Sequence, residues 1–434
     1  MNILVVGGGA REHALAWAVR RGGRERVVLC VPGNAGIAAV AECLPGDPTA
    51  VEALADLARS RQVDLTIVGP EAALAAGLSD ELERRGMKVF GASRAAAEIE
   101  TSKIFSKEFM LRHRIPTAAF GVADSAAAAA RILAQRGDRP AVVKADGLAA
   151  GKGVVVAATR REAEEAVAAM LVERRFGAAG DRILIEDRLT GPEVSFFALC
   201  DGERARALTT CQDYKRLEDG DRGPNTGGMG GYSPSVLLDA ALERAVMERI
   251  VLPTVRGLAA EGRPYRGVLY TGLMLTPEGP QVLEYNARFG DPEAELIAVR
   301  LAADLVEVIE ATLAGRLDEA PLRFHAGGAV CVVLAAAGYP GTPRAGDVIE
   351  GLETCSGQPG EGDVVVFHAA TRARQGRIET AGGRVLTVTA RAEDLAEARR
   401  RAYAAVAGLR FPGMQHRRDI AAFAAAGSGP APRA

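Results

Sequence analysis

Short apolar runs alternate with longer stretches of helical periodicity over the first hundred residues. The predicted strands and helices follow one another at 2–6, 13–20, 27–31, 50–60, 63–68, 72–85 and 87–90. Strands separated by helices are typical of an α/β domain whose sheet is parallel. We therefore expect a parallel α/β domain at the N-terminus, over residues 1–100.

The middle of the chain mixes strands and helices less regularly. A helix is expected from an N-cap at Thr101 or Ser102 to about His113. Further elements are predicted as strands at 194–199, 204–210, 267–275 and 281–286, and as helices at 125–136, 161–173, 239–260 and 293–313. The segment from Asp213 to Gly231 is polar and rich in glycine. A loop of that length is expected to be functional or disordered.

The pattern restarts near residue 325. Strands at 328–334, 364–367 and 384–389, followed by a helix at 391–408, predict a smaller α+β domain. The last residues, 427–434, are Gly, Pro and Ala in large part, and we expect them to be disordered. With 434 residues, the chain is long enough for three or four compact units of about 100–200 residues.

Composition excludes several classes of protein. Lys and Arg number 53 against 55 Asp and Glu, a formal charge of −2, so a general basic surface for nucleic acid or membrane is not expected. Six scattered cysteines without a Cys-x-x-Cys pair argue against a zinc ribbon or a disulfide framework. Without a secretory signal or an apolar run of about 20 residues, we expect a soluble cytoplasmic protein.

A glycine-rich loop flanked by two lysines carries the first chemical signal. It runs from Lys144 to Gly153 between apolar runs that are predicted to pair as strands, and it includes Gly151 and Lys152. Glycines let backbone N–H groups approach an anion closely, so the loop predicts a phosphate clamp. The spacing does not fit the phosphate loop of nucleoside triphosphatases, and Gly153 stands where Ser or Thr should be. An ordinary exposed turn is the alternative.

A second signal lies at the end of the strand predicted at 281–286. Glu284 and Asn286 are two residues apart, so their side chains share one face of the strand. A carboxylate and an amide oxygen suit a divalent ion bound to nucleotide phosphates. If the strand continues, Arg288 joins this face, where its guanidinium can hold a carboxylate or a phosphoryl group. A strand end with solvated polar residues is the alternative.

These two motifs resemble those of the ATP-grasp ligases, and the rest of the chain is similar to the phosphoribosylamine–glycine ligase family within them. The resemblance runs from residue 1 to about residue 425 and depends on six segments: Gly7–His13, Pro32–Gly36, Val68–Glu71, Lys144–Gly153, Gly223–Gly230 and Arg288–Glu293. The chain departs from the family at Tyr214, where His is usual, and at Ala294 and Glu295, where Thr-Gln is common.

The resemblance implies an α/β and α+β multidomain fold. The implied units are an N-terminal substrate-binding α/β domain, an ATP-grasp catalytic subdomain, an ATP-grasp lid subdomain, a C-terminal α+β domain and a tail, at 1–100, 101–120 with 188–325, 121–187, 326–425 and 426–434. The implied activity joins glycine to 5-phosphoribosylamine through glycyl phosphate, with ATP and Mg²⁺ or Mn²⁺. We expect a monomer that binds neither nucleic acid nor membrane.

The resemblance also implies roles for individual residues on the nucleotide side. Lys103 and Lys144 would hold phosphates, and Lys152 would close over them from the glycine-rich flap, with Gly151 and Gly153. Glu186 and Glu193 would contact the adenosine portion, although a solvated carboxylate is the alternative reading for a strand end. Glu284 and Asn286 would bind the metal, and Arg288 would steady the carboxylate or the acyl phosphate. Lys107 is interpreted as a solvated surface lysine.

On the substrate side, the first strand leads into a glycine turn and a helix start, a geometry that receives phosphate. The resemblance makes it the site for the phosphate of phosphoribosylamine, with Gly9, Arg11, Glu12, Asn34 and Glu71. A turn-forming role is the alternative for Asn34. Glycine or the sugar amine would be bound near Asp213, Gly290 and Asp291, and a mobile surface loop is the alternative for the segment after Asp213.

Three other functions compete with this one. Another ATP-grasp enzyme could activate bicarbonate instead of glycine. A nicotinamide-dependent oxidoreductase could be built on the first domain, but Glu12 replaces the third glycine of the dinucleotide fingerprint, and no acidic residue ends the second strand. A silent regulator would bind ATP and release no ADP.

Overall fold

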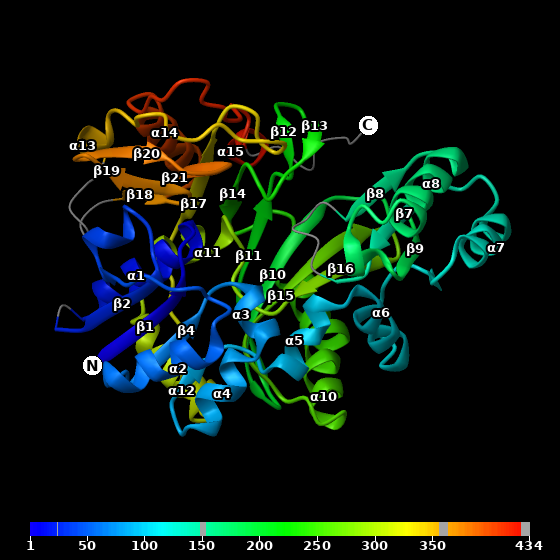
Figure 1. Cartoon of the computed structure of the whole chain (residues 1–434), viewed down its shortest axis with the longest axis horizontal. Helices are drawn as coiled ribbons and strands as arrows, with labels where there is room; N and C mark the ends of the chain where they lie inside the picture. Colours follow the sequence, from blue (N-terminus) through cyan, green and yellow to red (C-terminus); the bar gives the residue numbers. More distant parts are fainter. Residues whose placement is uncertain (24, 148–152, 356–362, 427–434) are drawn as a thin grey trace.

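The computed structural model describes residues 1–434 except 24, 148–152, 356–362 and 427–434. The N-terminal elements, the C-terminal elements and a central sheet form the main body in Figure 1, and a smaller unit carrying β7, β8, β9, α7 and α8 projects from it. The described chain is mixed α/β and α+β, as expected. None of its helices has both the length and the apolar character needed to cross a bilayer.

The N-terminal sheet is parallel, which confirms the alternating pattern of the first hundred residues. Its strands lie in the order β3-β2-β1-β4-β5, and their bounds are Asn2–Gly7 (β1), Val27–Pro32 (β2), Glu42–Cys43 (β3), Leu65–Val68 (β4) and Val89–Phe90 (β5). Its helices are Ala10–Gly22 (α1), Val51–Ser60 (α2), Glu71–Ala76 (α3), Leu78–Arg84 (α4) and Arg94–Thr101 (α5). The single helix predicted at 72–85 is wrong, because Gly77 adopts a left-handed φ of 92° and divides it.

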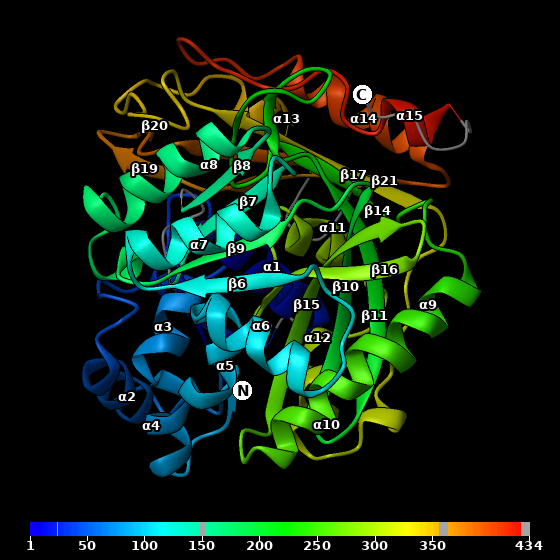
Figure 2. The ribbon, with the colours of Figure 1, turned by 90° about the vertical axis from the view of Figure 1, so that its right-hand side faces the viewer.

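The projecting unit contains a four-stranded antiparallel sheet in the order β6-β9-β7-β8. Its strands are Phe120–Ala123 (β6), Ala141–Ala145 (β7), Val154–Ala157 (β8) and Ile183–Asp187 (β9). Helices Ala126–Arg136 (α7) and Arg160–Val167 (α8) belong to the same unit, and Ser125 is the N-cap of α7 through its side chain. Lys144 pairs with Val154, so the predicted hairpin around the glycine-rich loop is confirmed. Figure 2 shows this unit in front of β10 and β15.

An eight-stranded antiparallel sheet joins the centre of the chain to its C-terminal part, in the order β16-β15-β10-β11-β14-β17-β21-β18. The central strands are Glu193–Gly202 (β10), Ala205–Asp213 (β11), Gly230–Ser233 (β14), Tyr265–Thr276 (β15) and Gly279–Asn286 (β16). The C-terminal strands are Gly328–Ala335 (β17), Val364–His368 (β18) and Arg384–Ala392 (β21). Cys331 of β17 pairs with Gly231 of β14, so the large sheet continues from the centre of the chain into the C-terminal unit.

The remaining elements surround these sheets. They include helices Lys103–Arg112 (α6), Ala240–Val246 (α9), Leu252–Ala260 (α10), Glu293–Arg300 (α11), Leu305–Leu313 (α12), Leu352–Cys355 (α13), Leu395–Val406 (α14) and Ala422–Ala425 (α15). The helix predicted at 293–313 is therefore two helices. Segment 213–231 is not a loop without structure, since it contains the hairpin of Arg216–Glu218 (β12) and Arg222–Asn225 (β13). A second hairpin, Thr371–Arg374 (β19) with Arg377–Thr380 (β20), was not predicted.

Candidate active site

Two buried lysines share one buried carboxylate where the projecting unit meets α6. Glu186 of β9 forms ion pairs with Lys144 of β7 and with Lys107 of α6, the latter at 2.5 Å, and Lys144 Nζ also donates to the carbonyl of Leu283 at 3.4 Å. Burial lowers the pKa of Lys107 to about 8, although Glu186 opposes the shift. The interpretation of Lys107 as a solvated surface lysine is therefore wrong. Lys107 lies among the buried residues of helix α6, which its charge in the sequence does not reveal.

Lys103 approaches the same region from the start of α6. Ser102 is the N-cap of the helix, and its hydroxyl also donates to Asp146 at 3.0 Å, while Lys103 Nζ donates to the carbonyl of Gly147 at 2.9 Å. Burial lowers the pKa of Lys103, Glu284 raises it and Lys144 lowers it, so the ammonium group lies near both side chains. Gly151 and Lys152, predicted members of the phosphate clamp, lie outside the described residues. Gly153 precedes β8.

The end of β16 places polar side chains on one side of the strand. Arg288 Nη2 donates to Asn286 Oδ1 at 3.1 Å and lies 2.9 Å from Glu100 of α5, and its Nε donates to Glu71 at 3.2 Å. Burial opposes the charge of Arg288, but Glu100 and Glu71 raise its pKa above the usual range. The predicted proximity of Arg288 to Asn286 is confirmed. Glu100, which also accepts from the backbone N–H of Ala287 at 2.6 Å, was missed by sequence reasoning.

The glycine turn after β1 is closed by Glu12. Its carboxylate accepts from the backbone N–H of Gly9 and from Arg11 Nε, both at 2.6 Å. Arg11 Nη1 also lies 3.9 Å from Glu71, whose pKa is lowered by Arg288 and Arg11 even though burial opposes this shift. Arg11, Glu71 and Arg288 therefore form one connected group, which joins the N-terminal domain to the end of β16.

Asn34 stabilises a turn, and both the oxygen and the nitrogen of its side-chain amide form hydrogen bonds. Its side-chain oxygen accepts from the backbone N–H groups of Gly36 and Ile37, both at 2.9 Å. Its amide nitrogen donates to the carbonyl groups of Gly8 and His368, at 3.0 and 2.7 Å. These contacts match the alternative reading of Asn34, and they also connect the N-terminal domain to β18.

A carboxylate-rich group lies beyond Glu284. Lys215 Nζ forms an ion pair with Asp213 at 2.5 Å, and Asp213, Glu293 and Glu284 all raise the pKa of Lys215 against the effect of burial. Glu293 is buried at the start of α11, and it accepts from Ser195 Oγ at 3.0 Å. Burial and Asp213 raise the pKa of Glu293. A Cβ atom on Gly290 would lie 2.1 Å from the carboxylate of Glu293, so a larger residue there would displace that buried side chain.

Asp291 connects this group to the C-terminal strands. Arg384 of β21 forms an ion pair with Asp291 at 3.1 Å and donates to the carbonyl of Gly227 at 2.7 Å. Next to it, Glu295 is fully buried, and neither of its oxygens has a hydrogen-bond partner among the residues that the structure describes. Burial and Asp291 raise the pKa of Glu295 well above its usual value, a shift that favours the neutral form of this carboxyl group.

The departures from the family pattern now have structural descriptions. The Tyr214 hydroxyl accepts from the backbone N–H of Ala421 at 3.0 Å, and its ring lies under the guanidinium of Arg417 at 4.7 Å. Tyr214 therefore fastens the segment after β11 to the C-terminal part of the chain. Of the other two departures, Ala294 is buried and Glu295 is the buried carboxyl group described above, whose pKa is raised.

Glu186 and Glu193, the two glutamates for which the resemblance implies adenosine contacts, lie in different surroundings. Glu186 is committed to its two lysines, which lower its pKa although burial opposes them. Glu193 begins β10, opposite Met274 of β15. Sequence reasoning also missed Lys215, Glu293 and Arg384. The motifs around Asp213 and Asp291 included the first two as neighbours, whereas nothing in the sequence near Arg384 indicates a contact with Asp291.

Comparison with protein families matches almost the whole chain. Family models described as phosphoribosylglycinamide synthetase N domain, ATP-grasp (A) domain and C domain match residues 1–100, 101–294 and 329–423. A phosphoribosylamine–glycine ligase of Caulobacter vibrioides is 50% identical over 423 residues, which are 97% of each chain. One of Pseudomonas aeruginosa is 48% identical, again over 97% of each chain.

Solved structures give the same result at the level of the fold. A crystal structure of phosphoribosylamine–glycine ligase from Thermotoga maritima has a TM-score of 0.84 and 34% identity, and the match covers 97% of this chain and 100% of that one. The biotin carboxylase domain of a Hydrogenobacter thermophilus 2-oxoglutarate carboxylase, solved with MgADP and bicarbonate, has a TM-score of 0.72 and 19% identity, over 96% and 91% of the two chains. The second likeness shows the shared fold only.

Proposed function

Because this chain belongs to the phosphoribosylglycinamide synthetase family, we propose that it joins glycine to 5-phosphoribosylamine in purine biosynthesis, with ATP converted to ADP and phosphate. The observation that carries this proposal is the convergence of Lys103 from α6 and Lys144 from the projecting unit beside Glu284 of β16. Two cations and a carboxylate at that position suit a metal-bound triphosphate.

The proposed reaction has two steps, formation of glycyl phosphate and then formation of the amide. A carboxylate oxygen of glycine attacks the γ-phosphorus of ATP, the bond to the β-phosphate oxygen breaks, and glycyl phosphate and ADP result. The amine nitrogen of phosphoribosylamine next attacks the acyl carbon, phosphate leaves and the nitrogen loses a proton. The substrates themselves supply both nucleophiles, so the protein has to position them and stabilise the transferred charge.

Lys103 and Lys144 are proposed to hold the nucleotide phosphates. Both ammonium groups are half-buried or buried, and a cation in such surroundings interacts more strongly with a phosphate than an exposed one does. Lys144 forms an ion pair with Glu186, which also forms an ion pair with Lys107. Glu186 is therefore proposed to orient Lys144 from behind, in addition to the adenosine contact that we propose for it and for Glu193.

The metal site is proposed at Glu284 and Asn286, which supply one carboxylate and one amide oxygen on the same side of β16. This donor set fits Mg²⁺ or Mn²⁺, which take the rest of their ligands from phosphates and water. The bound ion would neutralise charge on the transferred phosphoryl group. Arg288 Nη2 already reaches Asn286, so it lies where it can steady the glycine carboxylate or the acyl phosphate.

The sugar phosphate and the amine are proposed to bind on the far side of Arg288. Gly9 and Arg11, held by Glu12, present backbone N–H groups and a guanidinium to the phosphate, with Glu71 beside them. Asn34 would act by fixing the turn after β2. Asp213, Gly290 and Asp291 would bind the amino groups. The proposed lid, 121–187, with Gly151, Lys152 and Gly153 at its glycine-rich loop, would exclude water from the acyl phosphate.

An ADP-release assay with freshly generated phosphoribosylamine tests this proposal. We expect release that requires glycine and phosphoribosylamine together, and none with bicarbonate. ADP release driven by bicarbonate would instead indicate a carboxylase-like reaction, ATP binding without release under any condition would indicate a silent regulator, and saturable NAD(H) binding would indicate an oxidoreductase. Light scattering in the same buffer checks the proposed monomer.

The variant Glu284→Ala tests the proposed metal site in the same assay. Loss of a metal ligand should reduce kcat by about a hundredfold or more. The matched control is Glu278→Ala, in the exposed turn between β15 and β16, which should keep parental activity. Equal activity of the two variants would remove Glu284 from the metal site.

A further inference from the structure

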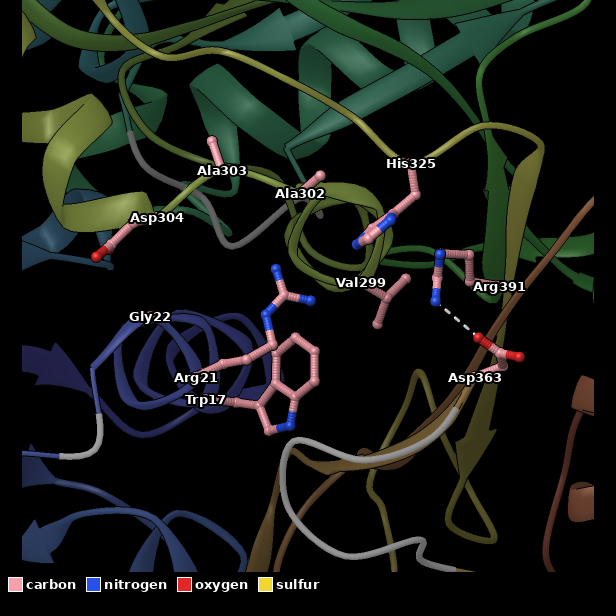
Figure 3. A pocket seen from close by; sticks show the side chains of 10 residues that line it. All are labelled: Trp17, Arg21, Gly22, Val299, Ala302, Ala303, Asp304, His325, Asp363 and Arg391. Carbon is pink, nitrogen blue, oxygen red and sulfur yellow. Dashed lines mark hydrogen bonds and ion pairs between the residues drawn. The ribbon is translucent and has the colours of Figure 1, made fainter.

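A separate cavity of about 650 Å³ lies among α1, the segment that connects α11 to α12, and the C-terminal strands (Figure 3). We name it the rear cavity, and its lining residues are Trp17, Arg21, Gly22, Val299, Ala302, Ala303, Asp304, His325, Asp363 and Arg391. None of them belongs to the proposed active site. The cavity lies toward the C-terminal end of α1, and its Arg21 is about 15 Å along the helix from Arg11 of the glycine turn, at 1.5 Å per residue.

The rear cavity is lined by two arginines, one histidine and two carboxylates. Arg21, His325 and Arg391 contribute cationic or titratable groups, and Figure 3 shows the Arg21 guanidinium and the His325 ring directed into the cavity. The carboxylates in the lining are already engaged. Asp304 accepts from Arg26 Nη1 at 2.8 Å, and Asp363 accepts from Arg391 and from Arg401, both at 2.7 Å.

Arg21 is held in this place without a carboxylate partner among the described residues. Its guanidinium lies 4.7 Å from the centre of the Trp17 ring and donates to the carbonyl of Leu301. Burial and then Arg391 lower the pKa of Arg21, although Asp304 opposes them. Burial, Arg391 and Arg21 also lower the pKa of His325, against Asp363. Like charges that face one another across a cavity lose this repulsion when an anion lies between them.

We propose that the rear cavity binds a small organic phosphate, with its phosphoryl group between Arg21, His325 and Arg391. Arginine forks match the geometry of phosphate oxygens and bind them in pairs. The volume is that of a typical small-molecule site, so a larger molecule than inorganic phosphate fits. Val299, Ala302 and the ring of Trp17 provide the apolar wall for the remainder, and the Trp17 indole N–H has no partner among the described residues.

The chain contains one tryptophan, and it lines this cavity, so Trp17 fluorescence reports on binding directly. The probes are AMP, inorganic phosphate and malonate, added to the full chain at equal ionic strength without divalent metal. We expect saturable quenching by AMP, at least about tenfold tighter than by the other two. No saturable change with AMP at millimolar concentrations, or equal affinity for malonate, would overturn the proposal.

Arg21→Gln should weaken AMP binding by about tenfold or more, because a charge-assisted hydrogen bond is lost. Arg20→Gln is the matched control, since Arg20 is the adjacent exposed arginine and does not line the cavity. Lys103→Met separates the two sites. If it removes the quenching while Arg21→Gln does not, AMP binds at the active site and the proposal fails.

His325→Gln gives a second test that does not depend on the folding of the Arg21 variant. An anion favours the protonated imidazole, so the parent should lose more affinity than His325→Gln as pH rises from mildly acidic to mildly alkaline. The comparison at each pH removes the titration of AMP itself, which both proteins share. Parallel losses of affinity in the two proteins would contradict the assignment of His325.

Discussion

Glu284 lies between two groups of ion pairs. Both groups consist of lysines and carboxylates, but one has more lysines and the other has more carboxylates. Toward the projecting unit, Lys103, Lys107 and Lys144 are opposed by Glu186. Toward the C-terminal strands, Lys215 is opposed by Asp213 and Glu293. Glu284 acts on the pKa of Lys103 and of Lys215, so the two groups adjoin. The lysine-rich group suits phosphates, the carboxylate-rich group suits amines, and the transferred phosphoryl group would pass between them.

The strongest test of this comparison removes a cation from the lysine-rich group. Lys144→Met should reduce kcat/KM for ATP by about a thousandfold, because a buried cation at a transferring phosphoryl group stabilises the transition state. The measurement is steady-state ADP release. Lys88→Met, on an exposed lysine that pairs with Glu310 at 3.4 Å, is the control and should be near parental. A loss under tenfold in Lys144→Met would show that the lysine-rich group does not hold the phosphates.

The next largest effect is on stability. Glu186→Gln leaves Lys107 and Lys144 buried without their carboxylate, so the free energy of unfolding should fall by about 3 kcal/mol. Urea denaturation followed by circular dichroism measures it. Glu164→Gln breaks an exposed pair with Arg160 and should change the free energy by less than about 0.5 kcal/mol. Equal effects would mean that the buried pairs contribute no more than surface pairs.

The carboxylate-rich group predicts a different kinetic signature. Asp213→Asn should raise KM for glycine or for phosphoribosylamine by about tenfold and leave KM for ATP near the parental value, because an amine loses its counter-charge. Initial rates with each substrate varied in turn measure this separation. Glu218→Gln, on the exposed part of the following hairpin, is the control. An increase in KM for ATP alone would contradict the assignment of amine binding to the carboxylate-rich group.

The smallest predicted effect concerns Glu295. Its pKa is raised in the folded chain, so the native state keeps a proton that the unfolded chain releases above about pH 4.3. The unfolding free energy therefore falls as pH rises from there toward the folded pKa. Glu295→Gln removes this penalty and should gain on the order of 1 kcal/mol at mildly alkaline pH, with little gain at acidic pH.

Denaturation curves at several pH values check this prediction. Glu307→Gln, on the exposed face of α12, is the matched control and should show no such trend. A pH-independent difference between Glu295→Gln and the parent would show that packing, and not ionisation, decides the effect.

The parts of the fold that local pattern controls were predictable from the sequence. Four of the five strands of the parallel sheet and the hairpin around the glycine-rich loop follow from apolar runs and glycines, whereas the two-residue strand β3 was not predicted. The break at Gly77 and the hairpin within 213–231 were missed, because a periodic or a polar pattern contains no signal for them. The pairing of β14 with β17 depends on residues about a hundred positions apart, which no local window covers.

The same division applies to the candidate site. Glu284 and Asn286 share a side of β16, so alternation was enough to group them, and Arg288, which lies just past the end of the strand, still reaches Asn286. Lys107 was misread because its burial is decided by Glu186 and Thr117, which other elements bring to it. Residues that act together within one motif can be grouped from the sequence. Ion pairs between residues of different motifs can be identified only from the three-dimensional structure.

The continuous sheet has a practical consequence for anyone who shortens this protein. A chain cut before β17 would leave β14 with an open edge of unpaired backbone N–H and C=O groups, and such edges recruit strands from other molecules. The C-terminal hundred residues thus protect this strand edge from self-association. A recombinant catalytic fragment without them should be insoluble unless that edge is redesigned.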